Sequence, residues 1–332
     1  MKVNYFFRNI QAGYSIQSVF NTILKAVSKQ LTVKSTYLPS PFASVTAILK
    51  NGFYACKRQG KQEINHVTGD VHYLLYFLNA RRTVVTVHDI MYYHYLKGIK
   101  KKLWKWIYID CLKRAAYVTF ISEFAKKQIL DVIDLPQERT RVIPNPVDPD
   151  FIYSPKTIHL EQPRILHIGT LERKNLKRTI RALRGISCHL RIVGRLDNDT
   201  VELLKAEGIT YSNVSNLTHA EIVEEYRQAD IINFPSTYEG FGMPIIEGQA
   251  TGRLVVTSNI SPMKEVAGEG ALLVDPYSVE DIRQAYLSLI SDQSLRDMLL
   301  QKGQENIEKY RAEKISCQYC DIYSVIEHEC FG

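Results

Sequence analysis

The chain has 332 residues, about twice the length of a typical single domain, and its 45% hydrophobic residues can supply two hydrophobic cores. No apolar run reaches the roughly 18 residues of a membrane span, and the aromatic patch before Arg8 is too short for a secretory signal, so a cytoplasmic protein is expected. The net charge of +7 is too small to indicate nucleic-acid binding; it suits a nucleotide diphosphate or an anionic membrane surface, and it also fits an ordinary solvated surface.

The first half of the chain alternates short apolar runs with longer amphipathic runs, a pattern typical of parallel sheets crossed by helices. The predicted strands are Val3–Phe7, Leu31–Ser35, Ile64–Val67, Thr83–Val87 and Tyr117–Ile121, and the predicted helices include Ser15–Lys29 and Ser122–Ile133. Ser122 is expected to cap the second of these helices, because Glu123 follows it and places an acid in the first turn.

Three prolines within Val142–Asp150 predict a stiff linker between two domains, because proline restricts both itself and its predecessor. The alternation restarts after this segment. The predicted strands are Arg164–Ile168, Leu190–Val193, Ile231–Phe234, Leu254–Thr257 and Ala271–Val274, and the predicted helices are Thr179–Leu183, Glu221–Gln228, Pro244–Ala250 and Val279–Ile290. Two doubly wound α/β domains facing each other across a cleft fit this order, with ligands at the carboxyl ends of the strands.

The segment from Phe234 to Glu247, FPSTYEGFGMPIIE, ends a buried strand, turns through two glycines and begins a helix near Pro244. Gly240 and Gly242 allow a ligand to approach the main chain, where free N–H groups of the helix suit a phosphate or a sugar hydroxyl. Glu239 and Glu247 could accept hydrogen bonds from the same ligand. The alternative is a tight glycine turn whose acidic residues only complement the helix dipole.

A second strand, glycine turn and helix start occurs in IGTLERKN, from Ile168 to Asn175. Gly169 makes the turn, and Arg173 with Lys174 places two cations at the start of the helix, an arrangement that suits a diphosphate. Arg195 follows a strand and a glycine in the same way, as a weaker repeat. A solvated basic turn is the alternative.

In the first half, His88 lies at the carboxyl end of an apolar strand, where its ring nitrogens could orient a sugar or donate a hydrogen bond to it. Asp70 follows a neighbouring strand in NHVTGD. A lone histidine is usually structural, and the two polar strand ends make a functional role for His88 an equal alternative. Gly13, after the first strand, marks the loop expected to lie nearest the ligand.

The six cysteines include one CxxC pair, Cys317 and Cys320, in a helical tail without a second pair to complete a zinc site. We expect unpaired packing thiols. Two DxD spacings, Asp148–Asp150 in the linker and Asp197–Asp199 in a polar turn, are interpreted as solvated acids rather than as metal ligands.

Residues 97–114, KGIKKKLWKWIYIDCLKR, read as one basic amphipathic helix whose apolar stripe is Trp104, Ile107, Tyr108 and Cys111. Such a helix could lie on an anionic membrane surface and bring the protein to a lipid-linked acceptor. The alternative is a core helix with a wet basic side.

The motifs FPSTYEGFGMPIIEGQATG, IGTLERKN, VIPNPVD, TVHD and EVAGEGALLVDP occur in the order of family 4 of the glycosyltransferases, glycosyl transferases group 1, which the chain resembles. It is most similar to bacterial mannosyltransferases of cell-surface polysaccharide and lipopolysaccharide synthesis. The resemblance implies a retaining, GT-B enzyme with two Rossmann-like domains: residues 1–147, joined by a tail at 309–332, for the acceptor, and residues 148–308 for the nucleotide-sugar donor.

The same resemblance assigns residues. Glu239 and Glu247 match the family's E-x7-E pair, the second holding the ribose and the first lying beside the donor sugar. Backbone amides at Gly240, Phe241 and Gly242 would bind sugar hydroxyls or phosphate, and Lys174 matches the diphosphate lysine. Thr170 stands where many members have arginine, so Arg173 is expected to substitute. His88 matches the histidine that contacts the transferred sugar, while Gly13 replaces a longer glycine pair.

The implied reaction needs no metal or other cofactor, because Lys174, Arg173 and helix amides stabilise the departing diphosphate. His88, Glu239 and Lys174 are the predicted catalytic residues, and Asp70 with His88 the acceptor-binding ones. The transferred group would be a hexose of mannose or glucose type, moved to a saccharide or lipid-linked acceptor. Two alternatives remain: a GT-B hydrolase or epimerase of nucleotide sugars, and a non-catalytic GT-B binding protein. No G-x-G-x-x-G follows a strand, which disfavours a dehydrogenase.

Overall fold

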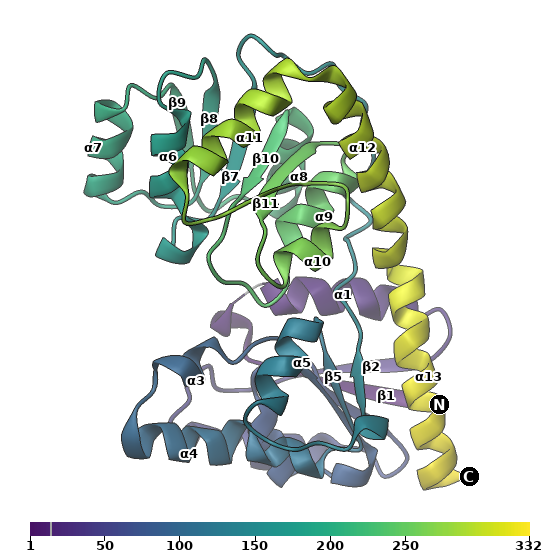
Figure 1. Ribbon diagram of the computed structural model, residues 1–332. Helices are drawn as coiled ribbons and strands as arrows, with labels where there is room; N and C mark the ends of the chain where they lie inside the picture. Colours follow the sequence, from purple (N-terminus) through teal and green to yellow (C-terminus); the bar gives the residue numbers. More distant parts are fainter. Residues whose placement is uncertain (14) are drawn as a thin grey trace. The chain divides into compact units, whose positions relative to one another are not determined.

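A computed structural model describes residues 1–13 and 15–332, which divide into two compact units (Figure 1). Unit 1 comprises Met1–Pro146 together with Arg311–Gly332, and unit 2 comprises Val147–Tyr310. The predicted boundaries at 147 and 309 lie one or two residues from these. The acceptor and donor roles of the two units stay predictions.

Unit 1 contains a six-stranded parallel sheet in the order β2-β1-β3-β4-β5-β6. Its strands are β1 (Lys2–Phe7), β2 (Thr32–Tyr37), β3 (Ile64–Val67), β4 (Thr83–Val87), β5 (Tyr117–Phe120) and β6 (Thr140–Val142). β3 and β4 are buried along their whole length. β4, TVVTV, has the apolar run expected of a central parallel strand, whereas β3 buries the polar Asn65 and His66, which form hydrogen bonds there. β6 was not predicted: it has three residues and overlaps the start of the expected linker.

The longer helices of unit 1 are α1 (Ser15–Val27), α2 (Val45–Arg58), α3 (Met91–Tyr95), α4 (Gly98–Tyr108), α5 (Glu123–Leu130) and α13 (Ala312–Phe331), with short 3-10 turns η1 (Ile10–Ala12), η2 (His72–Tyr76), η3 (Ala80–Arg82), η4 (Asp110–Arg114) and η5 (Gln137–Arg139). The predicted cap of α5 is confirmed, because the Ser122 side chain accepts a hydrogen bond from the Ala125 N–H. None of the helices in the described ranges is long and apolar enough to cross a membrane.

The prediction of one helix over residues 97–114 is wrong. α4 ends at Tyr108, and the remaining residues form the separate turn η4. The predicted apolar stripe faces inward: Tyr108 and Cys111 are buried, and Trp104 stacks on Tyr108 with ring centroids 4.9 Å apart. The orientation of the stripe therefore agrees with the core-helix alternative.

The C-terminal helix α13 packs on the sheet of unit 1 through a buried polar network. Tyr323 lies at its centre, with its hydroxyl 2.8 Å from the Tyr5 hydroxyl and 2.6 Å from His66 Nδ1, while His66 Nε2 lies 2.8 Å from the Thr86 hydroxyl. Burial lowers the pKa of His66 to about 3, so the ring is neutral. The predicted return of the tail onto the first domain is observed in unit 1. Cys317 and Cys320 both lie in α13, and neither forms a disulfide.

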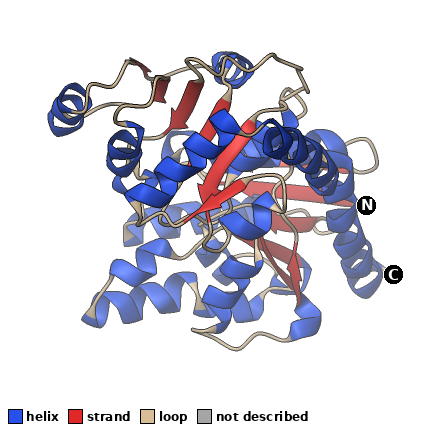
Figure 2. Ribbon diagram, turned by 45° about the horizontal axis from the view of Figure 1, so that its top comes forward, coloured by secondary structure: helices blue, strands red, loops and turns tan. Residues whose placement is uncertain are grey.

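Unit 2 contains a second parallel sheet in the order β12-β11-β10-β7-β8-β9, with helices beside its strands (Figure 2). The strands are β7 (Arg164–Ile168), β8 (His189–Val193), β9 (Tyr211–Val214), β10 (Ile231–Phe234), β11 (Leu254–Ser258) and β12 (Leu272–Val274). The helices are α6 (Leu176–Leu183), α7 (Asn198–Ala206), α8 (His219–Gln228), α9 (Met243–Ala250), α10 (Met263–Ala267), α11 (Val279–Ser291) and α12 (Gln293–Ile307), with turns η6 (Glu172–Lys174) and η7 (Glu308–Tyr310).

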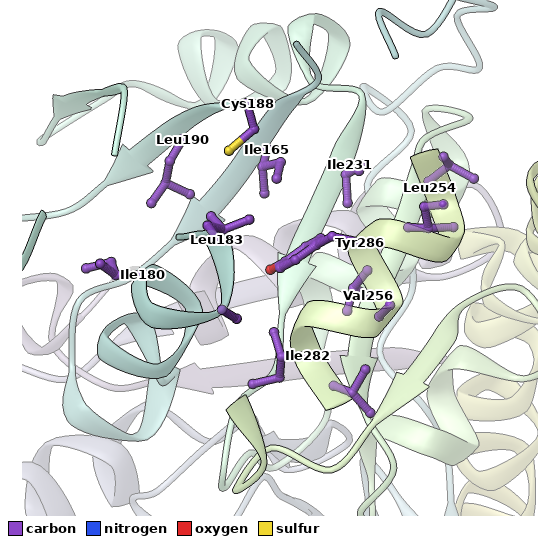
Figure 3. Close-up of a cluster of buried hydrophobic side chains, with 14 of the residues drawn as sticks. Ile165, Ile180, Leu183, Cys188, Leu190, Ile231, Leu254, Val256, Ile282 and Tyr286 are labelled. Carbon is purple, nitrogen blue, oxygen red and sulfur yellow. The ribbon is translucent and has the colours of Figure 1, made fainter. Parts of the chain in front are cut away.

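The core of unit 2 lies where α6 and α11 cover one face of this sheet. It contains Ile165, Leu190, Ile231, Leu254 and Val256 from the strands and Ile180, Leu183, Ile282 and Tyr286 from the two helices (Figure 3). The buried Tyr286 hydroxyl donates a hydrogen bond of 2.6 Å to Asn233 Oδ1, so burying this polar group leaves it satisfied.

Two elements of unit 2, β9 and α7, were not predicted. Asp197 lies in the loop before α7, where its carboxylate caps the helix by accepting a hydrogen bond of 2.7 Å from the Thr200 N–H, and Asp199 lies in the first turn of α7. The signal was present, since an aspartate before a helical run favours a cap.

Each sheet has a point where its strand order reverses direction. In unit 1 the reversal lies between β1 and β3, and in unit 2 between β7 and β10. In open parallel sheets, ligands bind outside the carboxyl ends of the strands at such a switch point. The loops after these four strands are therefore where a site is expected from the topology.

Candidate active site

Two loops meet at the switch point of unit 2. One runs from Gly169 to Lys174 after β7, and the other follows β10. They are joined by a hydrogen bond of 2.8 Å from the Thr237 N–H to the Arg173 carbonyl. Asn175, in the left-handed conformation with φ of 67°, donates from its side chain to the carbonyls of Pro235 and Pro276 at 2.9 and 2.6 Å. These contacts hold the basic turn against the glutamate loop.

An ion pair lies at the junction of these loops. Lys174 Nζ is 2.7 Å from Glu239 Oε1, and Arg173 Nε is 3.9 Å from the same oxygen. Lys174 also lies over the Phe234 ring, 4.6 Å from its centroid. Burial lowers the pKa of Lys174, and the Glu239 carboxylate opposes this shift. A largely buried cation held by a carboxylate and an aromatic face is thus presented at the switch point.

Gly169 is required by this geometry. Its φ of +92° is strained for other residues, and a Cβ there would lie 3.0 Å from Lys174 Cγ. The glycine therefore lets the lysine side chain pass over the end of β7.

The amino end of α9 lies at the same place. Gly242, with φ of 124°, precedes the helix, and no side chain caps it. Phe241 is 4% exposed and packs edge-on against Tyr310, with ring centroids 5.8 Å apart. Because the side chain of Phe241 packs against Tyr310, only its backbone could contact a nucleotide-sugar donor.

Glu247 lies on α9, and its Oε2 accepts a hydrogen bond of 2.5 Å from the Tyr226 hydroxyl. Burial raises the pKa of Glu247 to about 7, while Tyr226 and the charge of Lys174 act in the opposite direction. Lys174 interacts electrostatically with both glutamates. The structure thus brings Lys174, Glu239 and Glu247 together from three separate elements.

Arg195 lies after β8, beside the same loop. Gly194, with φ of +145°, packs against Thr170, whose Cγ2 would lie 2.8 Å from an added Cβ. The Arg195 side chain is exposed. Arg195 therefore lies beside the cluster of Lys174, Glu239 and Glu247 rather than within it.

In unit 1, His88 follows β4 next to the switch-point loop after β3. Its Nε2 donates a hydrogen bond of 2.8 Å to the Thr68 carbonyl, which can only accept. Burial lowers the pKa of His88, so the neutral ring presents Nδ1 as an acceptor. The expectation that His88 could donate to a sugar is corrected: its N–H is already used.

Asp70, Arg8 and Gly13 lie together after β3 and β1. Arg8 Nη1 is 3.2 Å from Asp70 Oδ2, and Asp70 is exposed. An added Cβ at Gly13 would lie 2.6 Å from the Arg8 guanidinium, so this glycine makes room for the arginine. Asp70 also acts electrostatically on His88.

Several residues of the site were not identified in the sequence. Tyr226 and Thr68 each contact a predicted site residue through one hydrogen bond, and Thr237 donates two to the Arg173 carbonyl; no spacing signals these residues. Asn175 had one signal, since asparagine favours the left-handed conformation.

Asp148 and Asp150 were predicted to be solvated acids, but both lie beside His219. Their carboxylates lie 3.7 and 3.1 Å from His219 Nε2, and the three ligand atoms lie within 4.8 Å of one another. This set could hold a divalent cation. Its contacts also fasten the start of unit 2 to α8.

Comparison with known proteins decides the family. The model of glycosyl transferases group 1 matches residues 150–306, and that of glycosyltransferase family 4 matches residues 33–151. Together they cover residues 33–306 of the chain. The chain is a family 4 glycosyltransferase. The predicted resemblance is confirmed.

Relatives and solved structures agree with this assignment. O-antigen chain mannosyltransferase B of Escherichia coli is 26% identical over 270 residues, covering 74% of this chain and 71% of that protein. Several other E. coli relatives are longer, and the match covers about a quarter of their length.

Among solved structures, sucrose-phosphate synthase from Thermosynechococcus elongatus superimposes with a TM-score of 0.81 at 16% identity, covering 99% of this chain and all of that one. Anabaena HepE, in complex with UDP and glucose, superimposes with a TM-score of 0.77 at 15% identity, covering 98% of this chain and all of that one. The predicted GT-B fold class is therefore confirmed for this family 4 glycosyltransferase.

Proposed function

We propose that this glycosyltransferase moves a hexose, of mannose or glucose type, from a nucleotide-diphosphate sugar to a saccharide or lipid-linked acceptor in cell-surface glycan synthesis. The relative that makes O-antigen supports the pathway and the mannose. The HepE complex with UDP and glucose supports a nucleotide donor. The observation that carries the proposal is the buried Lys174–Glu239 pair beside the uncapped start of α9.

The donor would bind at the switch point of unit 2. Lys174, Arg173 and the backbone amides at the start of α9 suit the diphosphate, because a helix start without a side-chain cap and two cations all favour negative charge. Glu247 would accept hydrogen bonds from ribose hydroxyls. Glu239 would lie beside the donor sugar, and its ion pair with Lys174 would orient the lysine. Gly169 and Arg195 border this region.

The chemistry follows from the charge that develops as the anomeric C–O bond to phosphate breaks. Lys174 and Arg173 stabilise that charge more in the transition state than in the ground state. The acceptor hydroxyl oxygen forms the new bond on the face the phosphate leaves, and its proton passes to a phosphate oxygen. This route retains the anomeric configuration and uses protein cations in place of a metal.

His88 would contribute through Nδ1, its remaining acceptor. A hydroxyl of the transferred sugar or of the acceptor can donate to this nitrogen, and Asp70 offers a second acceptor nearby. Gly13, in the same loop, makes room for the Arg8 side chain that pairs with Asp70. A site that combines both units stays a prediction.

We further propose that the protein works on the inner face of the cytoplasmic membrane, with residues 97–114 as a peripheral contact. The four lysines of α4 and the absence of any acid within that helix support this.

The test is a transfer assay with purified protein, a panel of UDP, GDP, ADP and dTDP sugars, and NMR analysis of the product. The expected result is an α-linked product from an α-linked donor, at an undiminished rate in excess EDTA. Loss of activity in EDTA that manganese restores would overturn the metal-free part. Free sugar or an epimer formed at full rate without acceptor would support the hydrolase or epimerase alternative instead.

A further inference from the structure

The outer face of α4 carries large apolar side chains that are more than half exposed. Ile99, Leu103 and Trp106 are 84%, 51% and 58% exposed. Their spacing of four and then three residues places them on one side of the helix. Lys100 and Lys102 are exposed beside them. This face combines apolar and cationic groups, opposite the buried face formed by Tyr108.

The helix α2 repeats this arrangement. Val45, Leu49 and Phe53, each four residues apart, are 68%, 45% and 59% exposed. The opposite face, with Ala47, Asn51 and Ala55, is buried. α2 contains no Asp or Glu, and Lys50 and Lys57 are exposed on it.

Aromatic contacts through η2 join the two helices. Phe53 of α2 lies edge-on to Phe77, with ring centroids 5.6 Å apart, and Trp106 of α4 lies 5.6 Å from Tyr76. Tyr76 and Phe77 are consecutive. The Tyr76 hydroxyl also donates to the Trp106 carbonyl at 2.6 Å. The exposed stripes therefore belong to one continuous surface.

Gly52 supports this junction. A Cβ at this position would lie 2.4 Å from the Phe77 ring, so only glycine lets α2 approach so closely. The close packing of α2 against Phe77 therefore depends on the glycine at position 52.

The charge of unit 1 selects the kind of partner. Residues 1–62 contain nine Lys and Arg and no Asp or Glu. Unit 1 as a whole has 24 Lys and Arg against 12 Asp and Glu, whereas unit 2 has 18 against 23. A second copy would present the same cations to this surface, and like charges would repel it. An anionic surface that accepts apolar side chains is complementary.

We propose that α2 and α4, joined by Tyr76 and Phe77, form one docking surface for an anionic lipid bilayer. This docking surface extends the membrane contact proposed for residues 97–114 to α2, a helix that was not predicted from the sequence to contact a membrane. The apolar side chains enter the interface between headgroups and acyl chains, and the lysines contact anionic headgroups. Binding to lipid needs no turnover, so its failure and that of the proposed transfer reaction can be distinguished.

The first experiment is co-sedimentation of the full chain with phosphatidylglycerol-containing vesicles and with phosphatidylcholine vesicles. The wild type binds only the anionic vesicles. Val45→Ser/Leu49→Ser on α2 and Ile99→Ser/Leu103→Ser on α4 each weaken binding about ten-fold or more, because apolar burial is lost. Ile152→Ser/Met298→Ser, at exposed positions of unit 2, binds as the wild type does. Equal thermal unfolding midpoints show that the variants fold.

A second measurement places each helix directly. Both tryptophans of the chain, Trp104 and Trp106, lie on α4. In Trp104→Phe protein, brominated lipid quenches the emission of Trp106. In a Trp104→Phe/Trp106→Phe background, Leu49→Trp is quenched equally and Met298→Trp is not. Absence of quenching at Leu49→Trp, or wild-type binding by the α2 variant, would overturn the two-helix surface. Equal binding to neutral vesicles would overturn its anionic specificity.

Discussion

At the scale of single residues, the site depends on charged groups that folding has removed from water. Lys174 is 16% exposed and Glu239 11%, so each would be costly to bury without the other. The pair keeps a cation at the switch point in the absence of ligand. A departing diphosphate can then compete with Glu239 for the same ammonium group.

Lys174→Ala is expected to lower kcat by about 10²–10³-fold, because one preorganised contact to the developing charge is lost. The measurement is steady-state transfer at saturating donor. Lys177→Ala, which removes an exposed cation nearby on α6, serves as the control and should retain activity. Because the variant removes the nearer of the two cations beside Glu239, its folding is checked by circular dichroism. Unchanged kcat in folded Lys174→Ala would refute the role.

The raised pKa of Glu247 makes stability depend on pH. In the unfolded chain a glutamate titrates near about 4.3, whereas burial raises the pKa of Glu247 to about 7. Between these values the folded state retains a proton that the unfolded state releases. The free energy of unfolding should therefore fall as pH rises from about 4.3 to about 7. Urea unfolding at pH 5 and pH 8 measures this fall in the free energy of unfolding, which should be smaller in Glu247→Gln than in the wild type. An identical fall in both proteins would exclude Glu247 as the source.

Tyr226 should tune this titration. Its hydroxyl donates to Glu247 and favours the carboxylate, so Tyr226→Phe is expected to raise the pKa of Glu247 further. Donor binding that requires the carboxylate would then weaken at pH 7 and recover at pH 9. Calorimetric titration with the donor nucleotide across this range measures the midpoint. A uniform loss at every pH would indicate a purely structural role for Tyr226.

At the scale of secondary-structure elements, the docking of α13 depends on hydrogen bonds more than on sequence pattern. Tyr323 satisfies two buried partners, Tyr5 and His66, that lie on different strands. These contacts specify where the helix packs, because each partner would be left unsatisfied by another position of the helix.

Tyr323→Phe should destabilise unit 1 by about 1–3 kcal/mol, the typical effect of leaving a buried partner unsatisfied. Chemical unfolding followed by fluorescence of Trp104 and Trp106 reports on this unit. Val325→Ala, on the exposed side of the same helix, is the matched control and should have little effect. Equal stability of the two variants would contradict the network.

At the scale of the whole molecule, the two units have opposite net charge and separate cores. Unit 2 has more acids than bases, yet it contains the basic turn predicted to bind a diphosphate. Local arrangement rather than net charge therefore governs that site. Unit 1, by contrast, presents its positive charge broadly.

Because the two units have separate cores, calorimetry should resolve two unfolding transitions. A donor nucleotide should raise mainly the midpoint temperature of the transition of unit 2. At about 100 times its dissociation constant the ligand should stabilise unit 2 by about 2.7 kcal/mol. Glu247→Ala should lose this shift while keeping both transitions. A shift in the tryptophan-bearing unit 1 alone would place the nucleotide elsewhere.

The sequence by itself determined the alternation of strands and helices, the switch from one domain to the next, and the glycine turns at Gly169 and Gly242. These are local properties, governed by hydrophobic period and by backbone freedom. It indicated β6 and β9 poorly, since TRV and YSNV are short and contain few apolar residues. It left open whether the apolar stripe of residues 104–111 faces the core or a membrane, because both faces of α4 carry apolar side chains.

Only the tertiary structure decided which side chains meet. The pairing of Lys174 with Glu239, of Tyr226 with Glu247 and of His88 with Thr68 joins residues 65, 21 and 20 positions apart. Each depends on loops brought together by parallel strands, and the same burial that forms the contact sets the pKa of Lys174, Glu247 and His88. Such contacts have no local signal, because desolvation arises only when the whole sheet is assembled.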